Sequence, residues 1–485
     1  MKKTWLIILS ALLLFVPSVL VFFSGDDWFH LRITQIGSLG EFLNFFSFSH
    51  TAQSAAFYRP LPTQLFFYIF QHLFGLTAWP YHLFVLICFG YSLYLVYLFA
   101  GKIQKSTTKE PRTINFALIT TLAYGLSISN FTRLYFLSAF QEISLVIFSL
   151  LCLLSFPKSV LKTIVFFVLA LLSKETAVVI PLLLLLFNFK YLKKNSMHLT
   201  SVICISVIYL YFRFMVFGGA VGDSYVWNFS PVKAANTLMW YVLWSFGAPE
   251  LLVDYVGSGL RLVPKFFVDY PVWWKVIIPL LGGTLLTTLI LFIQRGRGLL
   301  RYYVTRNDEL KTQSIQFMKY ILFFLISISP VIFLPSHKFA LELGLPLVGF
   351  SLAIAWLIPK KLNILSFCFF AFFVFLNLSM NYLTHTRHYS VSRGEISQKV
   401  YRYFSENYPQ YPFGSYFVFI NDSTDHGEQW GQSKQISQAL SGSDFFKVFY
   451  KIPDIKVYYQ DIPDEYPTSD ILRIQLSTKQ FLINE

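Results

Sequence analysis

The feature that most constrains this 485-residue chain is a series of eleven apolar runs, each a candidate for crossing a lipid bilayer. A membrane-spanning helix needs about 20 mostly apolar residues. Hydrophobic residues make up 55% of the chain and charged residues 13%, whereas a soluble domain averages about 25% charged residues. The sequence therefore predicts an α-helical polytopic membrane protein with about eleven transmembrane helices. The runs lie at residues 5–23, 80–101, 113–129, 135–155, 159–172, 175–189, 198–217, 271–293, 317–334, 339–358 and 362–381.

The basic residues are spread over short loops between the apolar runs, and this distribution excludes a nucleic-acid partner despite the net charge of +14. Cytoplasmic loops of membrane proteins carry an excess of Lys and Arg. A cytoplasmic N-terminus followed by eleven alternating crossings puts five basic loops on the cytoplasmic side. This threading predicts a multi-pass plasma-membrane protein with an extracytoplasmic C-terminal tail. The five loops lie at residues 102–112, 158–162, 190–194, 295–306 and 360–361.

Two further apolar stretches do not fit this threading as crossings. The segment at 61–76 is short, and we expect it to be a juxtamembrane helix that lies in the membrane interface. Its polar residues fall on one helical face, namely Gln64, Tyr68, Gln71 and His72. The segment at 234–252 is assigned to a large external loop, because a crossing there would move the Arg-rich loop at 294–316 outside. A membrane span is the alternative for this second segment.

From residue 382 onward the composition becomes polar, which divides the chain into a transmembrane domain at 1–381 and a soluble domain at 382–485. The segments SYFVFIND, IKVYYQ and RIQLS predict strands. The segment WGQSKQISQALSGSDFFKVFY predicts one helix. We therefore expect a small C-terminal α+β domain on the extracytoplasmic side.

Ionisable residues gather near the span ends on the predicted non-cytoplasmic side. Cations there run against the positive-inside trend, so they indicate an anionic ligand at that surface. Arg and Lys bind phosphate through charge-assisted hydrogen bonds, and a nearby carboxylate can take a proton from an attacking hydroxyl. Such a set suits sugar transfer from a lipid phosphate. The candidates are Asp26, Asp27, His30, Tyr58, Arg59, Arg133, Lys174, Glu175, His337 and Lys338.

Four short motifs, in this order along residues 1–380, resemble the GT-C class of membrane glycosyltransferases: DDWFHL, FYRPLPTQLFFYIFQHLFG, SKET and LPSHKFALELGLPLVGF. The branch that they resemble most contains the protein O-mannosyltransferases and the lipid A aminoarabinose transferase. The resemblance implies a GT-C-like fold with juxtamembrane helices in the first external loop. It also implies an inverting enzyme that takes a monosaccharide from a polyprenyl-phosphate-linked donor. The acceptor, whether protein, lipid or polysaccharide, stays unassigned.

The resemblance also bears on individual residues. The family's general base is the first acid of the pair, which is Asp26 here, and Asp27 stands where many members have Glu. We predict a catalytic pair made of these two acids. The predicted donor phosphate-binding residues are Arg59, Lys174, Lys338 and Arg133. The predicted substrate-pocket residues are His30, Tyr58, Glu175 and His337.

The sequence indicates no metal site and no cofactor. All four cysteines fall inside apolar runs and show neither a CxxC nor a Cys/His spacing, so neither zinc binding nor a disulfide framework is expected. A divalent metal ion is compatible with the predicted reaction, but no residue pattern points to one.

Simpler interpretations compete at several positions. Asp27 could cap the helix that follows it. Arg59 could reach the lipid headgroups, and Lys174 could pair with Glu175 at a surface turn. Glu142 lies within a predicted span and needs a polar partner that the sequence does not identify.

Two other function classes also compete. A transporter or lipid flippase of cell-envelope precursors would be polytopic too, but such proteins usually show broken helices at the membrane midplane and internal repeats. Here the ionisable groups cluster at one face. An inactive sensor or assembly factor is the third class, and the intact acid pair argues against it. The expected partners are the bilayer, a polyprenyl-phosphate sugar donor and an unknown acceptor.

Overall fold

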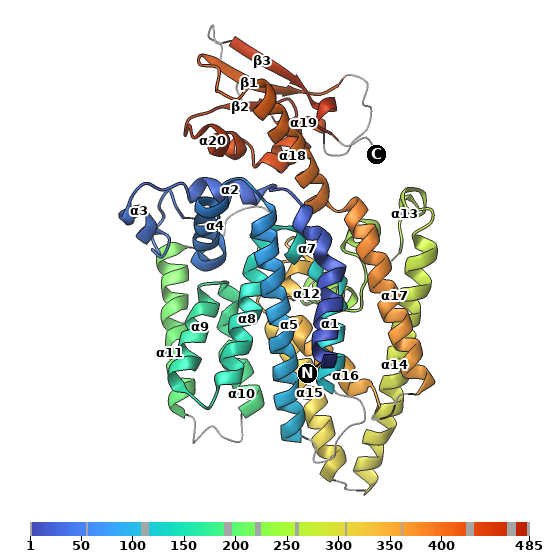
Figure 1. Ribbon diagram of the computed structural model, residues 1–485. Helices are drawn as coiled ribbons and strands as arrows, with labels where there is room; N and C mark the ends of the chain where they lie inside the picture. Colours follow the sequence, from blue (N-terminus) through green and yellow to red (C-terminus); the bar gives the residue numbers. More distant parts are fainter. Residues whose placement is uncertain are drawn as a thin grey trace.

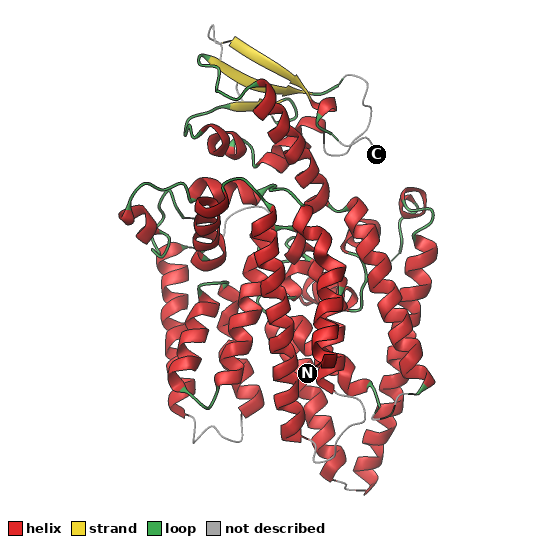
Figure 2. Cartoon of the chain, in the orientation of Figure 1, coloured by secondary structure: helices red, strands yellow, loops and turns green. Residues whose placement is uncertain are grey.

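Long helices form a bundle that carries a small domain of helices and strands at one end (Figures 1 and 2). The computed structural model describes residues 2–54, 57–107, 116–188, 196–218, 225–257, 261–305, 308–359, 361, 363–422, 431–462 and 472–482. Five helices in these ranges are long and apolar enough to cross a membrane, and six shorter ones are also apolar. These eleven helices correspond one by one to the eleven apolar runs. The chain is an integral membrane protein, and its number of crossings stays a prediction.

The first half of the bundle is arranged around α5, which packs against α1, α6 and α8. Next to it, α8 packs on α9, and α9 packs on α11. The helices of this half are α1 (Lys2–Phe15), α5 (Trp79–Thr107), α6 (Phe116–Leu126), α7 (Phe131–Tyr135), α8 (Phe140–Ser155), α9 (Val160–Leu171), α10 (Ile180–Asn188) and α11 (Ser196–Tyr211).

The second half is arranged around α16, whose twelve residues are all buried. A helix that is apolar on every side belongs inside a bundle, and α16 packs against both α15 and α6. The helices of this half are α12 (Pro231–Ser245), α13 (Lys265–Asp269), α14 (Trp274–Thr305), α15 (Asp308–Ile328), α16 (Pro346–Leu357) and α17 (Ile364–Arg387). The 234–252 segment thus holds α12, which has 15 residues and is shorter than a typical span.

Three short helices of the first loop lie at the end of the bundle that faces the C-terminal sheet (Figure 1). They are α2 (Asp26–Ile33), α3 (Leu39–Asn44) and α4 (Phe66–Phe74). On α4 the apolar side chains of Ile69, Leu73 and Phe74 are exposed, whereas Gln71 accepts a hydrogen bond from Thr34 of the segment after α2. Gln71 of α4 therefore faces protein, and an apolar side of the helix is left open, as an interfacial helix requires.

The C-terminal domain has a three-stranded sheet in the order β2-β1-β3, with both neighbours parallel to β1. Residues 415–419 of the central strand are buried on both faces, which is typical of a parallel sheet. Its elements are α18 (Tyr389–Asn407), β1 (Ser415–Ile420), α19 (Gln432–Leu440), α20 (Asp444–Tyr450), β2 (Val457–Tyr459) and β3 (Leu472–Ser477). All three predicted strands are present.

Two features of this region differ from the sequence prediction. The single helix predicted from the segment before β2 is wrong, because two helices, α19 and α20, form there. Ser441 and Gly442 between them have φ values of 54° and 62°, in the left-handed region that ends a helix. The other feature is α18, which the sequence analysis did not predict. Its buried Val391, Ile396 and Val400 recur at near-helical spacing, so the signal was present. The predicted domain boundary at residue 382 falls inside α17.

Candidate functional site

The two adjacent acids of α2 have different environments, and Asp27 is the buried one. Its carboxylate accepts three hydrogen bonds: from the Ser138 N–H at 2.8 Å, from the Ser138 hydroxyl at 2.6 Å and from the Ser24 N–H at 3.1 Å. Burial raises the pKa of Asp27 to about 7, although these donors favour the ionised form. Ser138 shortly precedes α8, so Asp27 ties the short helix α2 to the helical bundle.

Asp26 is the accessible acid: its side chain is exposed, although protein surrounds it on most sides. The Gly25 N–H donates to the Ala439 carbonyl across 2.8 Å, which holds the C-terminal domain against the start of α2. The surrounding protein raises the pKa of Asp26, the Arg393 guanidinium opposes this, and the Asp444 carboxylate adds to it. A reachable carboxylate with a raised pKa is suited to accepting a proton from a substrate.

The C-terminal domain packs on α2 through three further contacts. The indole N–H of Trp28 donates to the Ser397 hydroxyl at 2.9 Å, and its ring meets Phe445 edge-on at 4.9 Å. Arg32 forms an ion pair with Asp444 at 2.7 Å. Since α18 and α20 supply these groups, residues from both ends of the chain form the surroundings of the acid pair.

A buried ionic network lies at the same end of the bundle. Arg59 pairs with Glu175 through two hydrogen bonds of 2.8 and 2.5 Å, and it donates a third, of 2.5 Å, to Gln141. The carboxylate therefore receives the guanidinium in the two-pronged geometry that favours Arg over Lys. This bond joins the FYRPLP segment to the SKET turn. Two simpler interpretations are therefore wrong. Arg59 is buried, so it does not reach the lipid headgroups, and the partner of Glu175 is Arg59, not Lys174.

Lys174 extends the network to the late motif of the chain. Its ammonium group contacts Glu142 and, at 2.5 Å, Glu342, and all three side chains are buried. The partner that Glu142 needs is therefore Lys174. Arg133 lies nearby, because Arg133 and Glu142 both approach Gly344. A Cβ atom added at Gly344 would lie 3.3 Å from Nη1 of Arg133 and 2.6 Å from Oε2 of Glu142.

The cations and carboxylates of the network face one another. Arg59 is paired with Glu175, Lys174 is paired with Glu142 and Glu342, and Arg133 lies close to Glu142. Burying ions requires such compensation, because an unpaired buried charge destabilises a protein by several kcal/mol. Ionisable residues within membrane helices are also uncommon, and they usually mark a functional site.

The other sequence-predicted residues occupy varied positions. His30 is buried against Phe67, and burial lowers its pKa to about 3. Tyr58 stacks on Phe48 inside an aromatic cluster. The remaining two lie near the network or at its edge: His337 is 4.0 Å from Glu342, and Lys338 donates to Asn236 at 3.3 Å.

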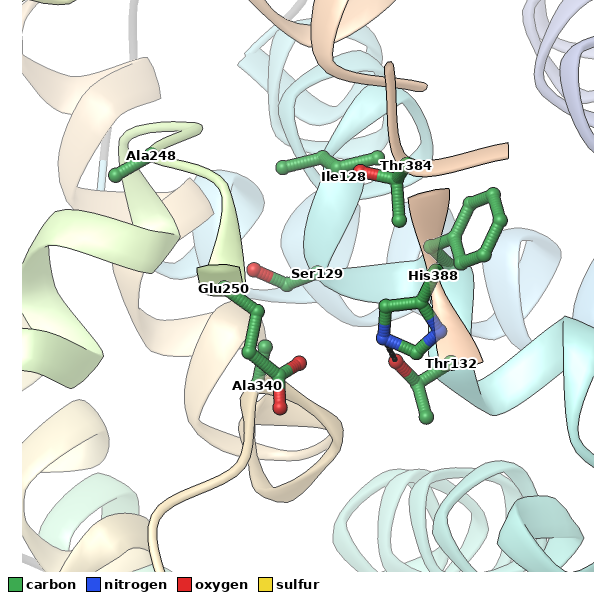
Figure 3. Close-up of a pocket in the computed structure, with 9 residues that line it drawn as sticks. Ile128, Ser129, Thr132, Ala248, Glu250, Ala340, Thr384 and His388 are labelled. Carbon is green, nitrogen blue, oxygen red and sulfur yellow. Dashed lines mark hydrogen bonds between the residues drawn. The ribbon is translucent and has the colours of Figure 1, made fainter. Parts of the chain in front are cut away.

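A small pocket, which the sequence analysis did not predict, lies between α7, the segment after α12 and the junction of α17 with α18. Figure 3 shows His388 and Thr132 pointing toward each other across it; their polar atoms are 3.4 Å apart. The Glu250 carboxyl also belongs to the lining. In the described part of the chain, no three His, Cys, Asp or Glu residues are grouped as a metal site would need.

Comparison with known proteins gives a weak similarity to solved structures. No family model matches the chain, and no curated protein matches it. The crystal structure of ArnT from Cupriavidus metallidurans bound to undecaprenyl phosphate is similar over 94% of this chain and 89% of that one. The sequence identity is 13% and the TM-score is 0.41. These values do not assign the chain to a family, so its function has to be inferred from its own residues.

The structure brings together most, but not all, of the residues that the sequence singled out. Arg59, Lys174 and Glu175 meet in one network, which Glu142 and Glu342 complete. The sequence analysis identifies Glu142 only as a residue that needs a polar partner, and it does not identify Glu342. Arg393, Glu250 and His388 were also missed, because each lies in a segment without a recognisable local motif.

Proposed function

We propose that this protein is an inverting glycosyltransferase that moves a monosaccharide from a polyprenyl-phosphate-linked donor to an acceptor at the non-cytoplasmic membrane face. One observation carries the proposal: a reachable carboxylate, Asp26, lies beside a rigidly held one at the end of the bundle where the buried ionic network is found. Proton abstraction and phosphate binding are the two tasks of such a transfer, and both chemical groups are available there.

In the proposed reaction Asp26 is the general base. It takes the proton of an acceptor hydroxyl while the hydroxyl oxygen attacks the anomeric carbon of the sugar. The bond from that carbon to the phosphate oxygen breaks, and the polyprenyl phosphate leaves with the electron pair. Attack opposite the leaving group inverts the anomeric centre. Asp27, held by Ser138 and Ser24, keeps α2 and therefore Asp26 in position.

The donor phosphate is proposed to lie between the acid pair and the ionic network. Arg59 and Lys174 are oriented by carboxylates, so they can share their charge with a phosphate without moving far. Arg133 and Lys338 complete the proposed set. His30, Tyr58, Glu175 and His337 are proposed to line the substrate pocket, with Glu175 acting through Arg59.

A transporter or flippase fits the arrangement less well. Coupling groups of transporters usually lie at the bilayer midplane. In this chain Glu142 is in the first turn of α8, Lys174 precedes α10 and Glu342 precedes α16. The network thus lies at helix ends, which suits chemistry at a membrane face.

The proposal is tested by replacing Asp26 in the source cells. Asp26→Asn keeps the shape of the side chain and removes its basicity, so transfer should fall by about 10² or more. Mass spectrometry of the extracted lipids should then show the polyprenyl-phosphate-linked sugar accumulating. Asp454→Asn, an exposed acid of the C-terminal domain, is the matched control and should behave as wild type. Unchanged donor levels in cells that contain normal amounts of the Asp26→Asn protein would contradict the proposal.

A further inference from the structure

The N-terminal half of α18 lies directly against the segment that carries the acid pair. At Gly394 a Cβ atom would come within 3.0 Å of the Val21 side chain and 3.1 Å of the Phe22 carbonyl, so the helix approaches as closely as glycine allows. One turn further on, Ser397 accepts the hydrogen bond from Trp28. The face of α18 that contains these residues is therefore turned toward α2.

Arg393 is next to this contact, and its side chain is held beside Asp26. Its Nη2 donates to Gln438 at 2.6 Å, and its guanidinium carbon lies 4.9 Å from the centre of the Tyr389 ring. Gln438 is adjacent to Ala439, which accepts the hydrogen bond from Gly25, the residue before Asp26. Two consecutive residues of α19 thus hold Arg393 and the start of α2.

Arg393 differs in its partners from the three cations that form ion pairs at this end of the molecule. Arg32, Arg59 and Lys174 each pair with a carboxylate. Arg393 has no carboxylate within 4.0 Å among the described residues, and its one side-chain hydrogen bond there goes to a neutral amide. A guanidinium has five N–H donors, so most of those on Arg393 are available to a ligand. Its positive charge is the one near Asp26 that an incoming anion would neutralise.

We propose that Arg393 binds the phosphate group of the lipid-linked donor, so that the C-terminal domain supplies part of the transfer site. The proposal rests on the proposed function, since it names a further ligand of the same donor. A planar guanidinium binds two phosphate oxygens at once, which also orients the leaving group. In this arrangement the domain does more than recognise an acceptor: without it, the phosphate site beside Asp26 is incomplete.

The test measures binding of undecaprenyl phosphate to the full-length protein in lipid nanodiscs, with undecaprenol as the uncharged comparison. Wild type should bind the phosphate lipid more tightly than the alcohol. Arg393→Gln should weaken binding of the phosphate lipid by about tenfold or more and leave binding of the alcohol unchanged. Arg393→Lys keeps the charge and should lose less. Arg402→Gln is the matched control, because Arg402 is an exposed residue of the same helix.

A purely structural role for Arg393 makes a different prediction. If Arg393 only ties α18 to α19, Gln438→Ala should weaken binding of the phosphate lipid as much as Arg393→Gln does, and that result would overturn the proposal. Anion binding requires that Gln438→Ala retain the preference for the phosphate lipid. This variant and Arg393→Lys decide the matter even if Arg393→Gln does not fold.

The outcomes separate the two proposals. Equal binding of phosphate lipid and alcohol by wild type would count against the proposed function itself. A wild-type preference that persists in Arg393→Gln would leave that function standing and remove Arg393 from it. Binding of inorganic phosphate as tightly as undecaprenyl phosphate would overturn the assignment to a lipid-linked donor.

Discussion

At the scale of single residues, two adjacent aspartates take different tasks because their surroundings differ. Asp27 is enclosed and accepts three hydrogen bonds, whereas Asp26 can be reached from solvent. Both carboxyl groups have pKa values above the ordinary range, and desolvation by the surrounding protein is the first cause in each case. Accessibility therefore distinguishes the proposed base from the residue that positions it.

Asp27→Asn should lower stability, whereas Asp26→Asn should not. The side-chain amide introduced by Asp27→Asn would place its NH₂ group against the N–H of either Ser24 or Ser138, which leaves buried donors unpaired. The expected loss is about 1–3 kcal/mol. Thermal unfolding of the purified protein measures it, with Asp26→Asn as the control. An Asp27→Asn protein as stable as wild type would show that these hydrogen bonds do not support the fold.

In a plot of transfer rate against pH, the loss of activity on the acidic side should occur at a higher pH than a general base with an ordinary aspartate pKa would give. A general base acts only when ionised, and the pKa of Asp26 is raised, so transfer should be lost as the pH falls through that raised value. Asp444 contributes to the rise, so Asp444→Asn should shift this loss of activity to lower pH. Initial rates of polyprenyl phosphate release across the acidic range measure both effects. A loss of activity that stays at the same pH in Asp444→Asn would contradict this electrostatic account.

At the scale of helices and strands, close contacts between the elements hold the bundle together. Gly349 of α16 is the clearest case among the described helices: a Cβ atom there would lie 2.6 Å from the Phe324 backbone nitrogen of α15 and 3.0 Å from the Tyr320 carbonyl. Backbone atoms cannot turn away as a side chain can. The spacing of α15 and α16 therefore depends on this glycine.

Gly349→Ala should destabilise the protein, whereas the same change at Gly101 should not. Overpacking at a tight helix contact costs about 1–3 kcal/mol. Gly101 of α5 has open space around it, so alanine there should raise helix stability by up to about 1 kcal/mol. Thermal unfolding of the two variants compares them directly. Equal melting temperatures of the two variants would mean that α15 and α16 can move apart without loss of stability.

At the scale of the whole molecule, the bundle has two different ends. The short helix α2, which holds the acid pair, and the C-terminal sheet share one end, and α5 and α14 run from there to the other (Figure 1). Sequence-based threading puts the first end outside the cell. This orientation predicts that donor, acceptor and C-terminal domain meet on the non-cytoplasmic side.

Cysteine labelling tests this orientation. In a background without the four native cysteines, Ser405→Cys in α18 should react with a membrane-impermeant reagent in intact cells, because the residue is exposed on the C-terminal domain. Lys105→Cys, exposed near the far end of α5, should react only after permeabilisation. The reverse pattern would invert the threading and exclude an extracytoplasmic site.

The amino-acid sequence by itself determined which segments are helices of the bundle and which are strands of the sheet. Apolar runs and alternating patterns are local properties: each of the eleven runs contains an apolar helix, and each of the three strand segments forms a strand. Local patterns also identified Asp26, Arg59 and Lys174 as unusual, since charge next to an apolar span is costly wherever the chain goes.

Only the tertiary structure decided how these residues are combined. Arg59 and Glu175 are 116 positions apart, and Lys174 and Glu342 are 168 apart, so no local pattern could pair them. The same applies to Arg393, which lies near Asp26 because α18 packs against the segment just before α2. Ion pairs and close contacts of this kind depend on distance in space, and chain folding alone sets that distance.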